Sequence, residues 1–580
     1  MSEAVQMPGG KKPGQLQKKP WYRQDVFLLL VISFGLGLFF SVLFYGAELL
    51  DVTNIGWVSS GDNATHYVGW HAYQHADWQK NFVAIDNVVS PFRTTIGLSD
   101  SIPLFALFFK LFQGILPSYF NYFGLWCVFI YWMQIFFGAL IVRRKTKSLL
   151  VMVLGGALFA ASMPFTYRLF THSALGGQFV LLAAIYVMLE YRSMRHANLA
   201  WIAVIVVSML IHPYLTFMCL ILLCGNILNI LLDKSIRIKS KLIDTAILLG
   251  GSLGALLAIG YALGYFSHAA ESMGGFGIYS MNLNALVNPL SSDLSLFMPA
   301  MPHIEGQSEG MMYLGLPIII VLVFLAIVRN KKLKQDFLSA WGSGKAVGVL
   351  AACIVLFLLA VSNVVTLGGD VLFTVPLGEP LLKLLNIFRV SARMFWPVFY
   401  FIYVLALYGL IKVFGEAKPL KGKLLPIVLC ALVALQFADL SKLILIKRSE
   451  IQNRVSYSTS LTSDFWEACK GKFDHIVFMP YILYDDYFDM AVYAIDNDMA
   501  FNGMTVARLD YAKMNEYLAG EIEKMKNGTF DKDSLYVIRD SEWLTSNPGL
   551  AEHLYIANVD GYTVLFDKGH PELAALTDGM

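Results

Sequence analysis

Residues 61–71, GDNATHYVGWH, combine a carboxylate with imidazoles soon after the first long apolar segment. Asp62 and His66 are four residues apart, so they share one face if the segment is helical. A carboxylate held partly out of water can act as a general base, which takes the proton from a reacting hydroxyl. We therefore predict catalytic roles for Asp62 and His66. The alternative is that Asp62 caps a helix while His66 and His71 are solvated in a loop.

Three further residues are candidates for the same site. Asp100, in LSDSIPLFALFFK, is a second carboxylate that would bind a metal or orient the acceptor, or else is an ordinary helix N-cap. His172 in RLFTHSALGGQF and His212 in HPYL fall at the ends of apolar segments on one predicted side of the membrane. We predict that both histidines face one polar cavity and bind substrate. Ordinary hydrogen-bonded packing is the alternative.

The loop 267–311 contains GFGIYSMNL and is followed by a segment that begins EGMMYLG. Tyr279 and Asn282 are candidate partners for sugar hydroxyls, and Glu309 and Tyr313 are further candidates for substrate binding. The alternative is a glycine-rich surface loop. A separate acidic group, Asp485, Asp486 and Asp489 in YDDYFD, lacks the spacing of a calcium loop and is better explained as a solvated helix start.

Arg389 and Arg393, in NIFRVSARMFWP, are the most informative cations of the chain. Their i,i+4 spacing predicts a pair, and a guanidinium suits bidentate binding of phosphate. The pair would lie on the outer side of the membrane, against the usual excess of cations in the cytoplasm. We predict that it binds a lipid phosphate, with contact to ordinary headgroups as the alternative.

The composition places these residues in a membrane protein. The chain has 580 residues, of which 57% are hydrophobic and 15% charged, and its mean hydropathy is +0.58. Soluble domains carry about 25% charged residues. A net charge of +2 gives no support for a nucleic-acid partner. We predict an α-helical polytopic membrane protein with a small soluble α/β domain at the C-terminus.

Eleven apolar segments are candidate spans. They are residues 26–47, 120–142, 149–164, 174–191, 199–211, 213–232, 242–266, 312–328, 346–367, 394–414 and 424–445. Alternate connections are basic, namely those at 143–147, 192–195, 234–241, 329–334 and 418–423, which predicts that they lie in the cytoplasm with the N-terminus. The apolar stretch 101–116 would invert this pattern, so we predict an interfacial helix there with Lys110 snorkelling to the surface.

Three regions follow from this topology. Residues 1–25 form a basic cytoplasmic tail, and residues 26–445 form the membrane domain with a long first outer loop at 48–118. The joint at His212-Pro213 predicts a tight hairpin between two spans. Residues 446–580 form an α/β domain on the outer side, with strands at 475–480, 534–539 and 562–567 and helices at 508–526 and 541–553.

The chain resembles the GT-C superfamily of membrane glycosyltransferases and a family of uncharacterised bacterial membrane proteins. The motifs that carry the resemblance are GDNATHYVGW, LSDSIPLFALFFK, HPYL, GFGIYSMNL and FRVSARMFWP. It implies transfer of a sugar from a polyprenyl-phosphate donor to a glycan or lipid acceptor outside the bacterial inner membrane, with Asp62 as the base or as the residue that orients the acceptor. Many GT-C enzymes have two adjacent acidic residues there, whereas Asn63 follows Asp62 here, so Asp100 must supply any second carboxylate.

Cofactors and alternative functions stay open at this stage. The resemblance implies either no cofactor or one divalent cation, Mg²⁺ or Mn²⁺. The expected partners are the polyprenyl-phosphate sugar, a glycan or lipid acceptor and the surrounding membrane lipids, with no nucleic acid. One alternative function is a transporter or flippase of a lipid-linked glycan, which predicts charges near the membrane midplane. Another is a non-catalytic assembly protein, which predicts that Asp62 tolerates substitution.

Overall fold

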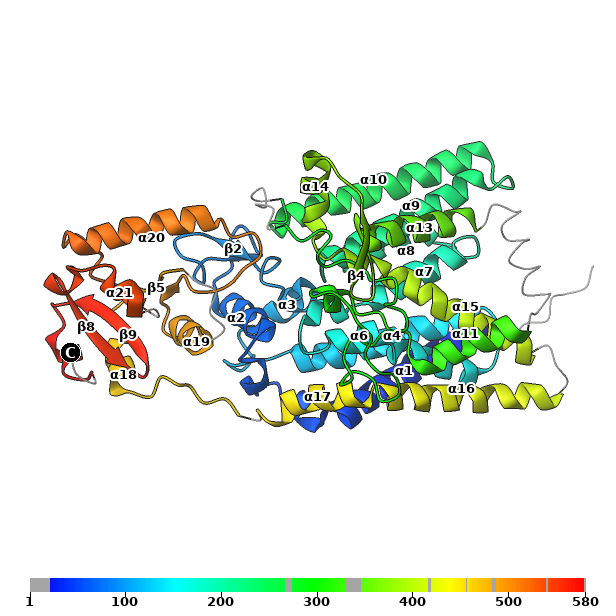
Figure 1. The fold of residues 1–580 in the computed structure, drawn as a ribbon, viewed down its shortest axis with the longest axis horizontal. Coiled ribbons are helices and arrows are strands. Elements are labelled where there is room, and N and C mark those ends of the chain that lie inside the picture. Colours follow the sequence, from blue (N-terminus) through cyan, green and yellow to red (C-terminus); the bar gives the residue numbers. More distant parts are fainter. Residues whose placement is uncertain are drawn as a thin grey trace, which may run out of the picture.

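The computed structural model describes residues 21–266, 274–328, 346–415, 419–454, 456–481, 487–538 and 541–577. Along its longest axis a helical bundle is followed by a smaller α/β domain at the C-terminal end of the chain (Figure 1). Most of the predicted tail 1–25, the basic connection 329–334, Lys418 and the pair Asp485-Asp486 lie outside the described residues.

Six helical stretches of the described chain are long and apolar enough to cross a membrane. They contain α1 (Trp21–Tyr45), α4 (Phe123–Arg143), α7 (Phe179–Glu190), α9 (Pro213–Leu232), α10 (Ile238–Ala262) and α15 (Trp396–Gly415). The pair α16 (Pro419–Asp439) and α17 (Ser441–Gln452), bent by 57°, adds a seventh if both helices belong to one span. The bundle therefore has the helices of a multi-pass membrane protein.

Four further apolar helices are shorter, with 12 to 15 residues. They are α5 (Leu149–Ala160), α8 (Ala197–Met209), α11 (Leu316–Val328) and α13 (Val347–Val361). At 1.5 Å per residue each reaches about 18–23 Å, less than the hydrocarbon thickness of about 30 Å. Each of the eleven predicted segments thus contains an apolar helix, but the count of eleven crossings stays a prediction.

The surface of α10 has the character of a lipid-facing helix. Leu242, Leu249, Leu253 and Leu257 are all more than half exposed, whereas Leu248, Ser252 and Gly260 are its buried residues. A continuous apolar stripe of this kind is rare on a monomeric soluble protein and marks contact with a membrane or a partner. The stripe therefore supports membrane insertion independently of helix length.

Three basic connections meet at one end of the bundle. Arg144, after α4, forms an ion pair with Glu190 at the end of α7, and Arg192 forms one with Asp233 at the end of α9. These connections are among those that the sequence predicts on one side of the membrane. The structure confirms that they share a side. It also shows α8 and α9 as two helices packed against each other, which confirms the predicted hairpin.

The first outer loop is folded rather than extended. Its elements are η1 (Ala47–Leu50), η2 (Gly56–Val58), α2 (Asp62–His75), a short ladder of β1 (Ala84–Ile85) and β2 (Thr94–Thr95), and α3 (Pro103–Lys110). With 8 residues, α3 spans about 12 Å and is too short to cross a membrane. This length agrees with the prediction that 101–116 does not cross, which stays a prediction.

Lys110 corrects one detail of that prediction. Its side chain is buried rather than snorkelling, and its ammonium donates to the carbonyls of Tyr73 at 2.5 Å, Gln74 at 3.3 Å and Ala76. The last carbonyls of a helix have no partner within the helix and carry partial negative charge. Lys110 therefore satisfies the C-terminal end of α2, and this interaction outweighs exposure of the charge to water.

Replacing Lys110 with methionine is expected to destabilise the first outer loop. Methionine keeps the apolar stem but leaves buried carbonyls of α2 without a donor, at a cost of about 1–3 kcal/mol. The thermal unfolding midpoint of the purified full chain in detergent should fall. Lys80→Met, which changes an exposed lysine of the same loop, is the matched control and should leave the midpoint unchanged. Equal midpoints for both variants would contradict the capping role.

The remaining connections near the first outer loop are short elements between long helices. They are α6 (Met163–Arg168), η3 (Ser173–Gly176), η4 (Gln307–Gly310), a hairpin of β3 (Val364–Leu367) and β4 (Asp370–Thr374), α14 (Glu379–Leu385), η5 (Asn386–Phe388) and η6 (Ser391–Phe395). Element η6 packs on η4, on α13 and on the start of α15. This packing joins parts of the chain that are far apart in sequence.

The C-terminal domain is built on a five-stranded sheet with strand order β6-β5-β7-β9-β8. The strands are β5 (His475–Met479), β6 (Ala500–Phe501), β7 (Ser534–Ile538), β8 (Leu554–Val559) and β9 (Tyr562–Asp567). Strand β5 pairs in parallel with β6 and β7, and strand β9 pairs antiparallel with β7 and β8. The helices are α18 (Asp464–Cys469), α19 (Phe488–Asp496), α20 (Tyr511–Lys526), α21 (Ser541–Thr545), η7 (Leu550–Glu552) and α22 (Pro571–Ala574). The three predicted strands are confirmed, and the predicted helix 541–553 is two short helices.

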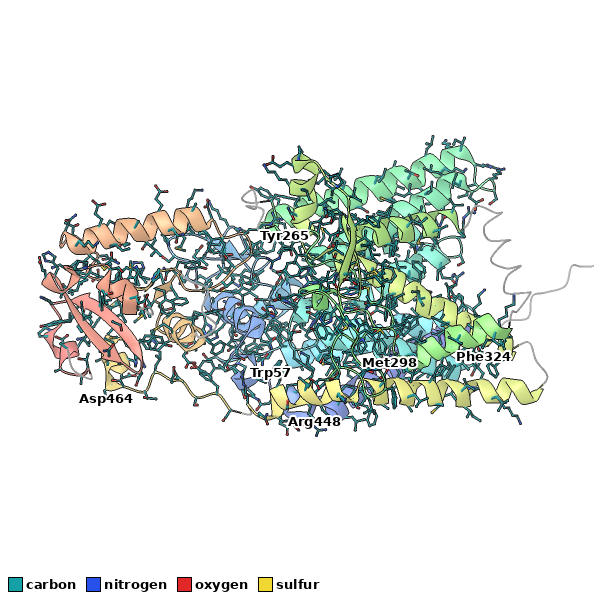
Figure 2. All side chains as sticks on the ribbon, in the orientation of Figure 1. Trp57, Tyr265, Met298, Phe324, Arg448 and Asp464 are labelled. Carbon is teal, nitrogen blue, oxygen red and sulfur yellow. The ribbon has the colours of Figure 1, made fainter. Side chains whose placement is uncertain are left out.

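The first outer loop and the C-terminal domain pack together. The amide of Ser90 donates to the carbonyl of Phe501 at 2.9 Å, and the amide of Phe501 donates to the carbonyl of Asn87 at 2.7 Å. Helix α19 packs against α2, and a single apolar cluster runs from the bundle into this domain. Trp57 lies in that cluster where the two parts meet (Figure 2). Both regions therefore occupy one end of the bundle, as the predicted topology requires.

Candidate functional site

Helix α2 presents Asp62 and His66 at its N-terminal end. Gly61 is the N-cap, so Asp62 is the first helical residue rather than the cap. The Asp62 side chain is 52% exposed, and its Oδ2 lies 3.3 Å from Nε2 of His172. His66 is buried, with its ring 6.5 Å from the ring of His172. Burial lowers the pKa of His66 to about 3, so its imidazole is neutral at physiological pH.

The residue after Asp62 has a structural task. Asn63 is buried, and its side-chain amide donates to the carbonyl of Phe170 at 2.6 Å. Phe170 has a φ of 58°, a backbone conformation that costs energy for residues other than glycine. A carboxylate cannot donate this hydrogen bond at neutral pH. This contact explains why an amide, and not a second acidic residue, suits position 63.

Asp100 joins the site from the other end of the first outer loop. It does not cap α3, because Ile102 occupies the N-cap position. Asp100 has a φ of 53°, and its Oδ1 lies 3.6 Å from Nε2 of His212. Partial enclosure by protein raises the pKa of Asp100 to about 6, although its side chain is 40% exposed; the charge of Arg393 opposes this shift and that of Asp62 adds to it. Asp100 therefore interacts electrostatically with both Arg393 and Asp62.

The two predicted histidines meet in this group. Nδ1 of His212, the N-cap of α9, accepts from the amide of Tyr214 at 3.1 Å. Burial lowers the pKa of His172 to about 2 and that of His212 to about 3, and Arg393 lowers both further. Nε2 of His172 faces the carboxylate of Asp62, and Nε2 of His212 faces that of Asp100. We name Asp62, His66, Asp100, His172 and His212 the polar cluster.

A second group, centred on Glu309, adjoins the polar cluster. Oε2 of Glu309 accepts from Arg393 at 2.5 Å and from Arg168 at 3.0 Å. The side chains of Arg168 and Arg393 are only 3% and 7% exposed. Partial burial would raise the pKa of Glu309, but the two guanidinium groups lower it overall. This arrangement holds two buried cations beside a cluster of carboxylates and neutral imidazoles.

Arg168 and Lys447 are residues that the sequence analysis missed. The sequence signal that could have identified Arg168 is its charge within an otherwise apolar region, at a predicted outer turn. Its Nε is buried without a hydrogen-bond partner among the described residues. Lys447, on α17, is 5% exposed, lies 3.6 Å from Glu450 and acts electrostatically on Asp62. No local pattern distinguishes this lysine from the other cations of its helix.

Contrary to the prediction from their spacing, Arg389 and Arg393 do not lie on one continuous helix, although both act electrostatically on Tyr214. The two would share a face on a continuous helix, but Val390 has φ −86° and ψ 74° and separates η5 from η6. Arg389 is exposed, and its guanidinium lies over the ring of Tyr279, 5.6 Å from the centroid. Arg393 instead lies over Tyr214 at 5.0 Å. The break in the helix is the reason for this correction.

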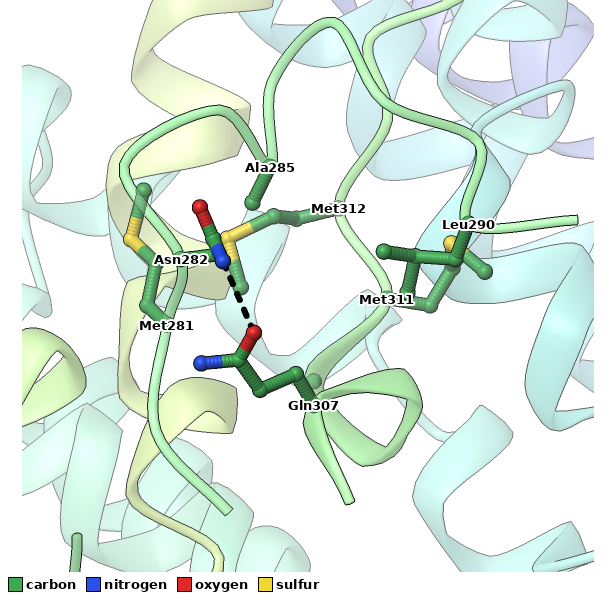
Figure 3. A pocket seen from close by; sticks show the side chains of 8 residues that line it. Met281, Asn282, Ala285, Leu290, Gln307, Met311 and Met312 are labelled. Atoms are coloured by element: carbon green, nitrogen blue, oxygen red, sulfur yellow. Dashed lines mark hydrogen bonds between the residues drawn. The ribbon is translucent and has the colours of Figure 1, made fainter. Parts of the chain in front are cut away.

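Asn282 and Tyr313 lie outside the polar cluster. Asn282 donates to Gln307 at 2.9 Å and to the carbonyl of Gly368 at 2.8 Å, and lines a cavity of about 10 Å³ that has room for about one water (Figure 3). The Tyr313 hydroxyl donates to Asp439 at 2.8 Å. The side chains of both residues form hydrogen bonds within the protein that link separate connections. Tyr279, in contrast, lies beside the exposed Arg389.

The polar cluster has the chemistry of a metal site. Ligand atoms of His66, Asp100 and His172 lie within 4.8 Å of one another. Nδ1 of His66 is buried without a hydrogen-bond partner among the described residues, which leaves it available to a ligand. Two imidazoles and a carboxylate suit Zn²⁺ and related transition metals, whereas Mg²⁺ prefers oxygen ligands. The residues thus fit a divalent cation, and the cofactor assignment stays a prediction.

Two family models match the chain, one over the membrane domain and one over the C-terminal domain. The model of a family described as "Domain of unknown function (DUF6311)" matches residues 34–441, and that of the "DUF6311 C-terminal domain" matches residues 465–567. No curated protein matches the chain significantly. ArnT from Cupriavidus metallidurans in the apo state is 10% identical with a TM-score of 0.45, and the same protein bound to undecaprenyl phosphate is 11% identical with a TM-score of 0.43. Each comparison covers 94% of this chain and 97% of the other. On the family match, which spans most of the membrane domain, the chain belongs to the DUF6311 family.

Proposed function

We propose that this protein is a glycosyltransferase that moves a sugar from a polyprenyl-phosphate carrier to a hydroxyl of a surface glycan or glycolipid. The observation that supports the proposal is the convergence of Asp62 and Asp100 with the buried arginines Arg168 and Arg393 at one end of the bundle. Sugar transfer from a lipid phosphate needs both a base for the acceptor and cations for the departing phosphate.

The location of the site agrees with a lipid-borne donor. In this proposal the polar cluster and the C-terminal domain face the periplasm of a bacterium, and the N-terminus and the basic connections face the cytoplasm. Nucleotide sugars do not reach that side, so the sugar must arrive on a membrane lipid. A carrier phosphate at the membrane surface lies at the depth of helix ends, where the connections bearing Arg389 and Arg393 are found.

The proposed step assigns the base role to Asp62. The acceptor oxygen forms a bond to the anomeric carbon, and the bond from that carbon to the phosphate oxygen breaks. Polyprenyl phosphate leaves with the electron pair, and the proton of the acceptor hydroxyl passes to Asp62. A side chain 52% exposed is accessible to an acceptor, and His172 at 3.3 Å orients the carboxylate.

The arginines are assigned to the phosphate. Arg393 and Arg168 are held in place by Glu309, so their positive charge is fixed before substrate binds. Arg389 is exposed beside Tyr279 and is assigned the first contact with the donor. His66, Asp100 and His172 are the residues that would hold a divalent cation, which when bound would stabilise negative charge on the phosphate. His212 lies beside Asp100, with its Nε2 3.6 Å from Oδ1 of the carboxylate.

Reconstituted full-length protein tests the proposal directly. With a polyprenyl-phosphate sugar and a glycan acceptor, wild type should release polyprenyl phosphate and extend the acceptor. Arg389→Ala should raise KM for the donor by about 10-fold, because an exposed charge-assisted hydrogen bond is worth about 1.5 kcal/mol, the low end of its usual range. Lys383→Ala, which removes an exposed cation of α14, is the matched control. Movement of a lipid-linked glycan across vesicles without sugar transfer would instead support a flippase.

A further inference from the structure

A second group of possible ligands lies where the first outer loop meets the C-terminal domain. Nε2 of His71 lies 2.8 Å from Oδ1 of Asp496, and the rings of His71 and His75 lie 4.4 Å apart. Ligand atoms of these three residues all lie within 4.8 Å of one another. His71 and His75 come from α2, and Asp496 is the last residue of α19 (Figure 1). The proposed sugar transfer uses none of them.

The spacing on α2 explains why both imidazoles point to one place. Residues four apart on a helix lie on the same face, and two histidines so spaced are a recurrent way to hold one metal ion. The His71 side chain is fully buried, whereas Asp496 is 24% exposed and His75 is exposed. The group therefore has a rigid buried ligand and an open side through which an ion can enter.

The outward contacts of these residues match those of metal ligands. Nδ1 of His75 donates to the carbonyl of His71 at 2.9 Å, and its Nε2 accepts from the hydroxyl of Ser118 at 3.3 Å. The lone pair of His75 is therefore on Nε2, and a bound metal ion would replace the contact of this atom with Ser118. Nδ1 of His71 faces the hydroxyl of Tyr67 at 3.5 Å, and the hydroxyl of Tyr119 donates to Oδ2 of Asp496 at 2.8 Å. Metal-binding side chains are commonly oriented by such second partners.

We propose that His71, His75 and Asp496 bind a divalent transition metal of the Zn²⁺ class, which fastens the C-terminal domain to the first outer loop. Two imidazoles and a carboxylate are a common zinc donor set, with bonds of about 2.0–2.2 Å. Tetrahedral coordination separates ligand atoms by about 3.3 Å at these bond lengths, so His71 and Asp496 need to open by only about 0.5 Å. Water completes the coordination, as in other sites with three protein ligands.

The metal would link two parts of the chain that are 421 residues apart at their nearest ligands, His75 and Asp496. It would act on α2, the helix that carries Asp62 and His66 at its other end. Fastening the C-terminal end of α2 to α19 restrains the orientation of the whole helix. The proposed metal site thus has a structural role, and it does not depend on the reaction performed at the polar cluster.

Metal content of the full chain in detergent tests the proposal. After chelator treatment and dialysis against Zn²⁺, His75→Ala and Asp496→Asn should each retain one fewer equivalent of zinc than wild type. Zinc content is compared as the difference between each variant and wild type, because every variant keeps His66, Asp100 and His172, which are themselves candidate metal ligands. Tyr119→Phe should weaken zinc binding by about 10-fold. His303→Ala, at an exposed histidine of another loop, is the control and should match wild type.

A second readout separates binding from general damage. Zn²⁺ should protect wild type from proteolysis between the membrane domain and the C-terminal domain, and it should protect neither variant. His75→Ala removes an exposed side chain, so it decides the outcome if Asp496→Asn misfolds. Equal zinc content in wild type and His75→Ala would overturn the proposal, as would zinc bound without any gain in protection.

Discussion

The Asp62→Asn variant is expected to lose sugar transfer by about 10²–10⁴-fold, the usual contribution of a positioned general base. Asparagine keeps the size of the side chain and its place at the start of α2, but it does not accept the proton of the acceptor hydroxyl. The contact with His172 is polar in either case, so the thermal unfolding midpoint should stay near that of wild type. Transfer is measured as kcat with donor and acceptor both saturating.

Asp77→Asn is the matched control for this prediction. Asp77 lies in the same outer loop just after α2, and its side chain is exposed. It should transfer sugar at the wild-type rate. If Asp62→Asn also retains full activity, Asp62 is not the base, and the reading of the protein as an assembly factor gains support. A loss confined to KM would point to a role in binding the acceptor rather than in proton transfer.

The second large effect is expected at Glu309. Its Oε2 is the shared partner of Arg168 and Arg393, both nearly inaccessible to solvent. Glu309→Gln keeps the shape but removes the charge that compensates two neighbouring guanidinium groups. Breaking a fully buried ion pair costs about 3–5 kcal/mol, and the 33% exposure of Glu309 reduces this to about 2–3 kcal/mol. The unfolding midpoint should fall, and transfer should fall with it because the arginines lose their fixed positions.

Glu305→Gln provides the comparison, because Glu305 lies in the same connection and is exposed. It should alter neither the midpoint nor the rate. A further variant, Arg168→Lys, keeps the positive charge but loses the forked geometry of the guanidinium. It should keep most of the wild-type stability and lose more of the transfer activity. If Glu309→Gln unfolds at the wild-type temperature, the carboxylate is not needed to hold the arginines, and the proposed fixed charge at the phosphate position fails.

Several features of the site could be read from local patterns. The i,i+4 spacing of Asp62 and His66 depends only on helix geometry, and α2 has that geometry. The alternation of basic connections follows from membrane insertion, and the ion pair of Arg192 with Asp233 agrees with it. His172 and His212 could be assigned to one side by the same count, and the structure brings them into one cluster.

Contacts between distant segments decided the rest. Arg168 and Glu309 are 141 residues apart, and no spacing rule connects them. Arg389 and Arg393 are not on one helical face because the backbone at Val390 separates η5 from η6, which packs against η4 and α13. Asn282 has the same chemistry as a sugar-binding amide, but its side-chain nitrogen already donates to Gln307 and to the carbonyl of Gly368.

The amino-acid sequence by itself determined that the chain is a membrane protein, which helical faces carry ionisable groups and which connections share one end of the bundle. These properties depend on composition and short periodicities, which hold wherever the segment is placed. Tertiary structure alone decided which of the groups meet, which are neutralised by burial and which only hold connections together. Those outcomes depend on packing between segments hundreds of residues apart, because a side chain's pKa and its free hydrogen bonds are set by its neighbours in space.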